Sequence, residues 1–147
     1  MAGTTLDVNS KELAALNKRL AKWFIKISKP SEAMKLIAQH LESQTRRRIE
    51  KEKSEPDGTA WQEWSEEYAK TRHANHSLLI GTQSMLDDIA SESGSDFAAV
   101  FTSMIYGRTH QEGDKSRDIP ARSYLGLSKD NARAIEKEIA KFMENSI

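Results

Sequence analysis

The side chains of this sequence that could do acid–base or metal chemistry lack the partners that such chemistry needs. His110 stands near Glu112 and Asp114, but no nucleophile or oxyanion-binding site accompanies it, so a small hydrolase centred on His110 has little support. His73 and His76 have a spacing that could bind a metal on a helix, but no third ligand stands at a matching spacing. We therefore expect no enzymatic activity, no catalytic residues, no metal and no cofactor.

Two adjacent carboxylates, Asp87 and Asp88, also fail as an acid–base pair. We place them where a strand begins, and neighbouring side chains in a strand point to opposite faces. Cysteine is absent, which excludes disulfides, thiolate nucleophiles and cysteine-bound zinc.

A run of cations ends the second predicted helix and is the one candidate nucleic-acid site. It consists of Arg46, Arg47, Arg48, Lys51 and Lys53. Glutamates are interleaved with these cations and cancel much of their field. The chain has 22 Lys and Arg against 22 Asp and Glu, whereas proteins that coat nucleic acid normally carry a basic excess. A nucleic-acid-binding accessory protein is therefore the alternative reading, and DNA contact is not indicated.

Three long helices must position these groups. Apolar residues recur at three- and four-residue steps over about 10–27, which predicts a first helix. A second follows from Ser31, with Pro30 suited to its first turn, and a last one starts at Ser128. A short helix is expected from Ser65 to Lys70 or Thr71.

Two strands are expected at 88–93 and 96–104, joined at Gly94-Ser95 as an antiparallel hairpin. The fold class is therefore α+β, with the long N-terminal helices and the C-terminal helix packed on a small antiparallel sheet. Residues 1–147 suit a single domain, and residues 1–8 read as a flexible lead-in. No apolar run approaches membrane-spanning length.

Two loops carry the strongest local signals. Pro56, Asp57 and Gly58 predict a tight turn, and Trp61 after it predicts a core anchor. The stretch from Ile105 to Ser128 reads as a shaped connection, neither regular helix nor strand, between the sheet and the last helix. Its two most prominent side chains are His110 and Arg122. We expect these two side chains and that of Gln111 to hold the loop by hydrogen bonds to backbone groups.

Four motifs in order resemble the phage virion morphogenesis family, the small tail-completion proteins of contractile-tailed phages and Mu-like prophages. They are PDGTAW at 56–61, LLIGTQSMLDDI at 78–89, YGRTHQEG at 106–113 and IPARSYLGLS at 119–128. Gly81 precedes Thr82, where the family usually has the glycine second. Ser123 and Tyr124 replace a common Pro-Phe, and Glu112 replaces an apolar residue.

The resemblance implies a structural phage protein with a tail-terminator-like fold. Such a protein completes or caps the tail and supports stable head–tail joining. It implies a homo-oligomeric ring, hexameric if it matches the six-fold symmetry of the tail, that contacts tail-tube and head–tail connector proteins. It also implies a location at the head-proximal end of the virion tail, with assembly in the host cytoplasm. A ring needs different patches to meet on neighbouring copies. We expect interface residues in the loop and hairpin, namely Tyr106, His110, Gln111, Gly113, Ile119, Pro120 and Arg122.

Overall fold

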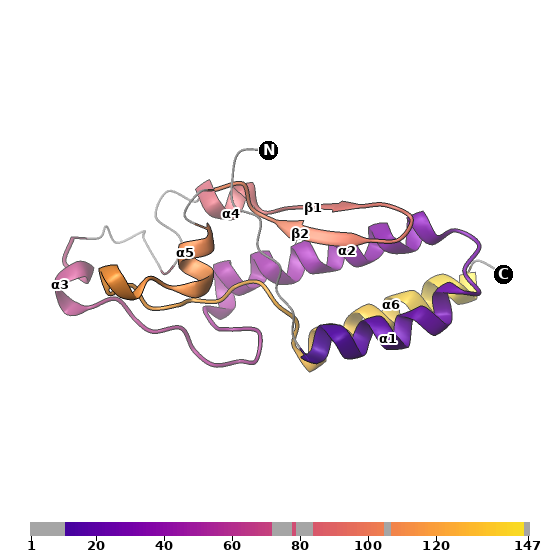
Figure 1. Ribbon diagram of the computed structural model, residues 1–147, viewed down its shortest axis with the longest axis horizontal. Helices are drawn as coiled ribbons and strands as arrows, with labels where there is room; N and C mark the ends of the chain where they lie inside the picture. Colours follow the sequence, from indigo (N-terminus) through magenta and orange to yellow (C-terminus); the bar gives the residue numbers. More distant parts are fainter. Residues whose placement is uncertain (1–10, 72–77, 79–83, 105–106, 146–147) are drawn as a thin grey trace.

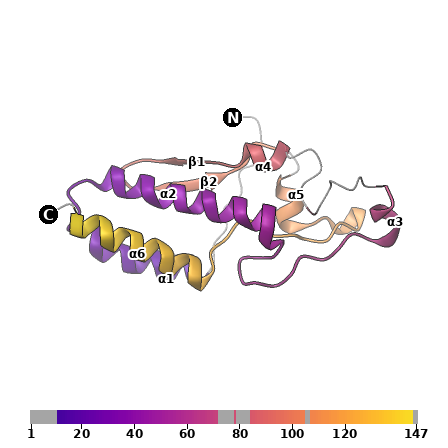
Figure 2. The same cartoon turned by 180° about the vertical axis from the view of Figure 1, so that it is seen from behind.

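The computed structural model describes residues 11–71, 78, 84–104 and 107–145. Helix α2 (Pro30–Arg47) lies between two layers, a β-hairpin on one side and the helices α1 (Lys11–Phe24) and α6 (Lys129–Asn145) on the other (Figures 1 and 2). Helices α1 and α6 run side by side in the same direction, and α2 runs back between them and the hairpin. The α+β prediction is confirmed.

The long helices begin where their sequence signals predict. Pro30 occupies the first turn of α2, and the side-chain oxygen of Ser128 accepts a hydrogen bond of 3.0 Å from the backbone N–H of Asn131 at the start of α6. The short helix α3 (Glu66–Ala69) is capped by Ser65, as its sequence predicts. None of the described helices is long and apolar enough to cross a membrane.

Two apolar clusters form the core. One fills the space between α1, α2 and α6, and its buried members are Leu16, Leu20, Ala33, Ile37, Leu127, Ala132, Ile135 and Ile139. The other lies under the long loops, and its buried members are Ile49, Trp61, Leu78, Leu86, Ile89, Tyr124 and Leu125. Trp61 is buried in this second cluster, so the prediction that it anchors the core is confirmed.

The hairpin is shorter than predicted. Strand β1 (Ala90–Ser93) pairs antiparallel with β2 (Ala98–Phe101), and Ala90 faces Phe101. Asp88 was wrongly assigned to the first strand, because it ends the short helix α4 (Ser84–Asp88). Its carboxylate accepts hydrogen bonds from the Thr102 hydroxyl at 2.7 Å and the Ser103 backbone N–H at 2.6 Å. These bonds join the residue that ends α4, just before β1, to the residues that follow β2, at the open end of the hairpin.

The prediction of no regular helix between Ile105 and Ser128 is also wrong. Gly107–Glu112 form helix α5, and Lys115–Arg117 form a 3₁₀ turn. Arg108 and Glu112 pair across one turn of α5 at 2.8 Å, and the left-handed Gly113 (φ +76°) closes the helix by donating to the Thr109 carbonyl. The glycines that suggested an irregular loop therefore flank a short helix.

We predict that Asp88→Asn destabilises the fold by about 1 kcal/mol in urea unfolding, because the carboxylate loses charge-assisted hydrogen bonds. Hydrogen bonds from Thr102 and Ser103 lower the pKa of Asp88. Its stabilising effect is therefore present above the usual carboxyl pKa of about 4 and is lost as pH falls through the lower pKa of the folded state. The difference between the wild type and Asp88→Asn should shrink at acid pH. Asp87→Asn, which changes the exposed neighbour, is the control and should have little effect.

Candidate assembly interface

The loop from Gly107 to Ser128 is held by the side chain of Gln111. Its amide oxygen accepts from the backbone N–H groups of Tyr124 (3.0 Å) and Leu125 (2.9 Å), and its amide nitrogen donates to the Leu125 carbonyl (3.1 Å). The Ser123 hydroxyl donates to the Gln111 carbonyl at 2.9 Å. Gln111 is 8% exposed, so these bonds form away from water and join α5 to the segment before α6.

Arg122 holds a second segment against the same loop. Its guanidinium donates to the carbonyls of Gln62 (2.8 Å) and Glu63 (3.4 Å), and its backbone N–H donates to the His110 carbonyl (2.7 Å). The Trp61 indole adds a bond of 2.9 Å to the Ser123 carbonyl. For Gln111 and Arg122, the prediction of hydrogen bonds to backbone groups is confirmed.

The turn at Pro56-Asp57-Gly58 closes the segment that Arg122 and Trp61 hold. Gly58 has φ +95° and donates to the Glu55 carbonyl at 2.9 Å, and the Asp57 carboxylate accepts from the Thr59 backbone N–H at 2.9 Å. The Pro56 ring lies against Gly126, where an added Cβ would come within 2.7 Å of it. The predicted turn is confirmed, and it packs on the loop before α6.

Tyr124 fixes the start of α5 from inside the second cluster. It is 1% exposed, its hydroxyl donates to the Gly107 carbonyl at 2.9 Å, and burial raises the pKa of the phenol above its usual value. The hydroxyl therefore keeps its proton and can donate this hydrogen bond. Gly107 is required here because an added Cβ would lie 2.7 Å from the Thr102 methyl and 2.9 Å from the Tyr124 oxygen.

Arg48 is the structural residue that the sequence does not reveal. It begins the π-helical turn Arg48–Glu52 that continues α2, and it is 2% exposed. Its guanidinium donates to the Tyr124 carbonyl at 2.6 Å and to the Asn131 side-chain oxygen at 2.7 Å, so it joins α2, the loop and α6. Burial lowers the pKa of Arg48, and the nearby charge of Glu52 opposes that shift. A run of cations gave no signal that one of them points inward.

Three of the other four cations of this run also make contacts within the chain. Arg46 donates to the Ile89 carbonyl at 2.5 Å, Lys53 donates to the Leu78 carbonyl at 2.6 Å, and Arg47 pairs with Glu52 at 3.2 Å. Together with Arg48, three of the five cations that suggested nucleic-acid binding bond to backbone carbonyls. The end of α2 therefore serves the fold more than it presents a basic surface.

The outward part of the loop is a small projection that begins at Gly113. Asp114 and Ile119 pair through two backbone hydrogen bonds of 2.8 Å, and Pro120 follows, half-buried. Hydrogen bonds from Ser116 and Arg117 lower the pKa of Asp114 to about 2. An added Cβ at Gly113 would lie 2.7 Å from the Ala121 backbone nitrogen, so glycine is needed to close the projection. Residues 115–118 at its tip are exposed.

His110 is half-buried on α5, and burial followed by the charge of Arg122 lowers its pKa. Within the described ranges, no group of three His, Asp or Glu side chains is placed to hold a metal ion. Tyr106, His73 and His76 lie outside the described residues.

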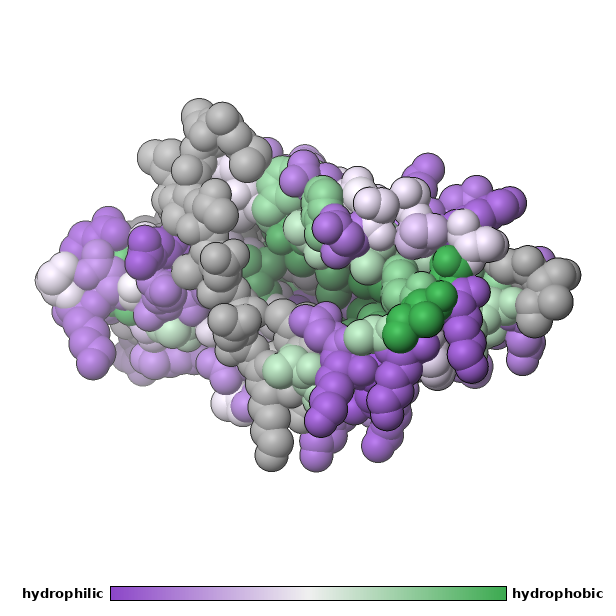
Figure 3. All heavy atoms as spheres, turned by 45° about the vertical axis from the view of Figure 1, so that its right-hand side comes forward, coloured by the Kyte–Doolittle hydropathy of each residue, from purple (hydrophilic) through white to green (hydrophobic). Residues whose placement is uncertain are grey.

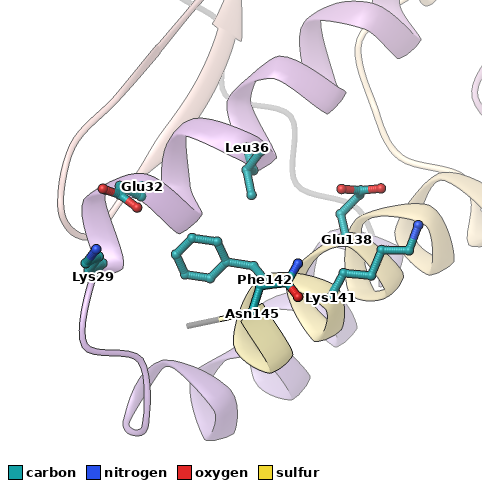
Figure 4. A pocket seen from close by; sticks show the side chains of 7 residues that line it. All are labelled: Lys29, Glu32, Leu36, Glu138, Lys141, Phe142 and Asn145. Atoms are coloured by element: carbon teal, nitrogen blue, oxygen red, sulfur yellow. The ribbon is translucent and has the colours of Figure 1, made fainter. Parts of the chain in front are cut away.

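A shallow pocket of about 360 Å³ lies away from this loop, between the start of α2 and the end of α6 (Figure 4). Its apolar side chains are Leu36 and Phe142. Around them stand two cations, two carboxylates and an amide: Lys29, Lys141, Glu32, Glu138 and Asn145. Because its charges balance, this lining favours no class of charged ligand.

We predict that Gln111→Leu lowers the free energy of unfolding by about 2–3 kcal/mol, because it leaves two N–H groups and one carbonyl buried without partners. Urea unfolding followed by circular dichroism measures this loss. Glu112→Gln changes the exposed neighbour and should shift stability by less than about 0.5 kcal/mol. Equal stabilities for the two variants would contradict the role given to Gln111.

We also predict that His110 makes the fold less stable at acid pH. Its pKa is lowered in the folded state, so its stabilising effect is full above the usual histidine pKa of about 6.5 and is lost as pH falls through the folded-state value. Thermal unfolding from pH 7.5 to 5 should show this loss, and His110→Gln should flatten the curve. His40→Gln, on α2, is the comparison, and an unchanged curve for His110→Gln would contradict the prediction.

The comparisons with known proteins agree with the sequence motifs. The chain is 27% identical over 118 residues to "Putative capsid assembly protein G" of Escherichia phage Mu, an alignment that covers 73% of this chain and 75% of that protein. No solved structure matches. The model of the phage virion morphogenesis family matches residues 11–144, which include both strands and the α-helices of the described structure except the last residue of α6. The chain therefore belongs to the phage virion morphogenesis family.

Proposed function

We propose that this protein completes or caps the phage tail and supports stable head–tail joining, without enzymatic activity. The family match carries the broader statement, a structural or assembly role in a phage. The four motifs that resemble tail-completion proteins support the narrower one. We further propose a tail-terminator-like ring of identical copies, located at the head-proximal end of the tail and assembled in the host cytoplasm. Its partners in this proposal are tail-tube and connector proteins.

The internal support of the loop favours a role in binding other proteins. Gln111, Arg122 and Trp61 hold it with hydrogen bonds to backbone groups from two segments far apart in the sequence. A surface that is rigid before binding loses little conformational entropy on assembly. Residues 115–118 at the tip of the projection are exposed on this support.

This arrangement separates two groups among the expected interface residues. Gln111 and Arg122 are buried within one chain, and Gly113, Ile119 and Pro120 shape the projection. We propose that these residues act on assembly by holding the loop, and that exposed residues at the tip contact the tail-tube or connector proteins. Replacing Arg122 would also free the segment at Gln62 and Glu63, so variants of the tip separate assembly from folding better.

Electron microscopy of a phage lysate that lacks this gene, beside the complemented lysate, tests the proposed function. We expect heads and tails to accumulate unjoined, or tails to have irregular ends, and complementation to restore virions. Intact infectious virions without the gene would reject the structural role. A lysate that lacks heads altogether would reject tail completion and indicate capsid assembly, the role in the name of the Mu protein.

A further inference from the structure

Helix α1 and the residues that follow it carry a group of cations that has no counterpart in the predictions from sequence. Residues 14–29 contain five cations and no carboxylate. Arg19 pairs with Glu136 of α6, whereas none of the ion pairs among the described residues involves Lys18, Lys22 or Lys26. All three lysines are exposed; Lys18 and Lys22 lie one turn apart on α1, and Lys26 lies in the turn that follows the helix. We call them the lysine stripe.

An exposed apolar side chain lies within this basic surface. Ile25, between Lys22 and Lys26 in the sequence, is 86% exposed, the highest value among the large apolar residues that the structure describes. Figure 3 shows long hydrophilic side chains gathered where α1 lies, with an apolar patch next to them. A surface of this kind matches a partner that is acidic and carries an apolar group of its own.

The same chain has such a surface around helix α3. Residues 62–69 contain three glutamates, Glu63, Glu66 and Glu67, and no cation. Trp64 and Tyr68 pack edge to face with ring centres 6.0 Å apart, and Tyr68 is 48% exposed. Neither Glu66 nor Glu67 takes part in an ion pair within the described ranges. We call residues 62–69 the acidic arm.

The two surfaces lie at opposite ends of the molecule. Figures 1 and 2 place α3 at one end of the long axis, and the C-terminal end of α1, where it leads into α2, at the other. They therefore cannot meet within one rigid chain. Two copies that join them meet head to tail, and a repeated head-to-tail contact closes into a ring when its rotation allows.

We propose that the acidic arm of one copy binds the lysine stripe of the next, with the Trp64–Tyr68 pair seated near Ile25. This inference rests on the proposed function, because it names the contact that would repeat around the ring. A second copy suits the stripe better than a nucleic acid does, because the chain has a net charge of zero and supplies the complementary acidic surface itself. Exposed ion pairs are individually weak and are screened by salt, so the contact is salt-dependent.

Paired charge reversals test this contact. Lys22→Glu/Lys26→Glu and Glu66→Lys/Glu67→Lys each place like charges across it. We expect sedimentation velocity at low salt to show self-association about tenfold weaker for either variant than for the wild type. In a 1:1 mixture, every stripe again meets an arm of opposite charge on the other variant, so we expect association to return to the wild-type level.

Lys35→Glu/Lys137→Glu is the control, because it makes the same change in charge at exposed sites on α2 and α6 and should leave association unchanged. Circular dichroism of each variant checks folding. A wild type that stays monomeric at low salt, a stripe variant that associates normally, or a mixture that stays dissociated would overturn the proposal.

A gel-shift assay with double-stranded DNA tests whether the lysine stripe binds nucleic acid instead of a second copy of the chain. Binding to DNA that is lost in Lys22→Glu/Lys26→Glu, while self-association is unchanged, would assign the stripe to nucleic acid and reject this contact. These assays use purified protein, so their results are independent of the electron microscopy of phage lysates that tests the proposed function. Virions restored by complementation, together with a monomeric wild type, would reject the contact and leave the assembly role standing.

Discussion

The structure depends on one buried cation. Arg48 places its guanidinium between the Tyr124 carbonyl and the Asn131 side chain, where α2, the long loop and α6 meet. A buried charge is costly unless hydrogen bonds satisfy it, so this position tolerates few other arrangements of its neighbours. The Asn131 side-chain oxygen also accepts from the Ser128 backbone N–H, which links the cation to the start of α6. The Arg48 contacts thereby set the direction in which the last helix leaves the loop.

The sequence predicts the three long helices well because their apolar periodicity is carried by many residues. It predicts less of the loop, because the contacts that shape the loop join single side chains to distant backbone groups. Gln111 and Arg122 were expected to bond to backbone, but nothing in their spacing shows that the partners are Leu125 and Gln62. Arg48 was hidden in a charge run that is typical of a solvated helix end. The Asp88 contact was hidden because adjacent aspartates before a strand look like part of it.

The two ends of the molecule have different kinds of support. The end that contains α1 and α6 is held by one apolar cluster, and the end that contains the loop is held by the second apolar cluster together with hydrogen bonds around Gln111, Arg122 and Tyr124. The candidate binding surfaces are outside both. The tip at residues 115–118, the lysine stripe and the glutamates of the acidic arm are exposed, so these side chains can differ without disturbing the core, whereas Trp64 of the arm packs against the second cluster.

Several side chains of this region donate their hydrogen bonds to main-chain carbonyls, and this affects how the sequence can change during evolution. Arg122 bonds to the carbonyls of Gln62 and Glu63, and Trp61 bonds to that of Ser123. A main-chain carbonyl persists whatever side chain its residue carries. Positions 62 and 63 can therefore accept substitutions while the few donor residues preserve the shape. A fold built in this way can retain its architecture through extensive sequence drift, and the 27% identity to the Mu protein is a degree of divergence that it can accommodate.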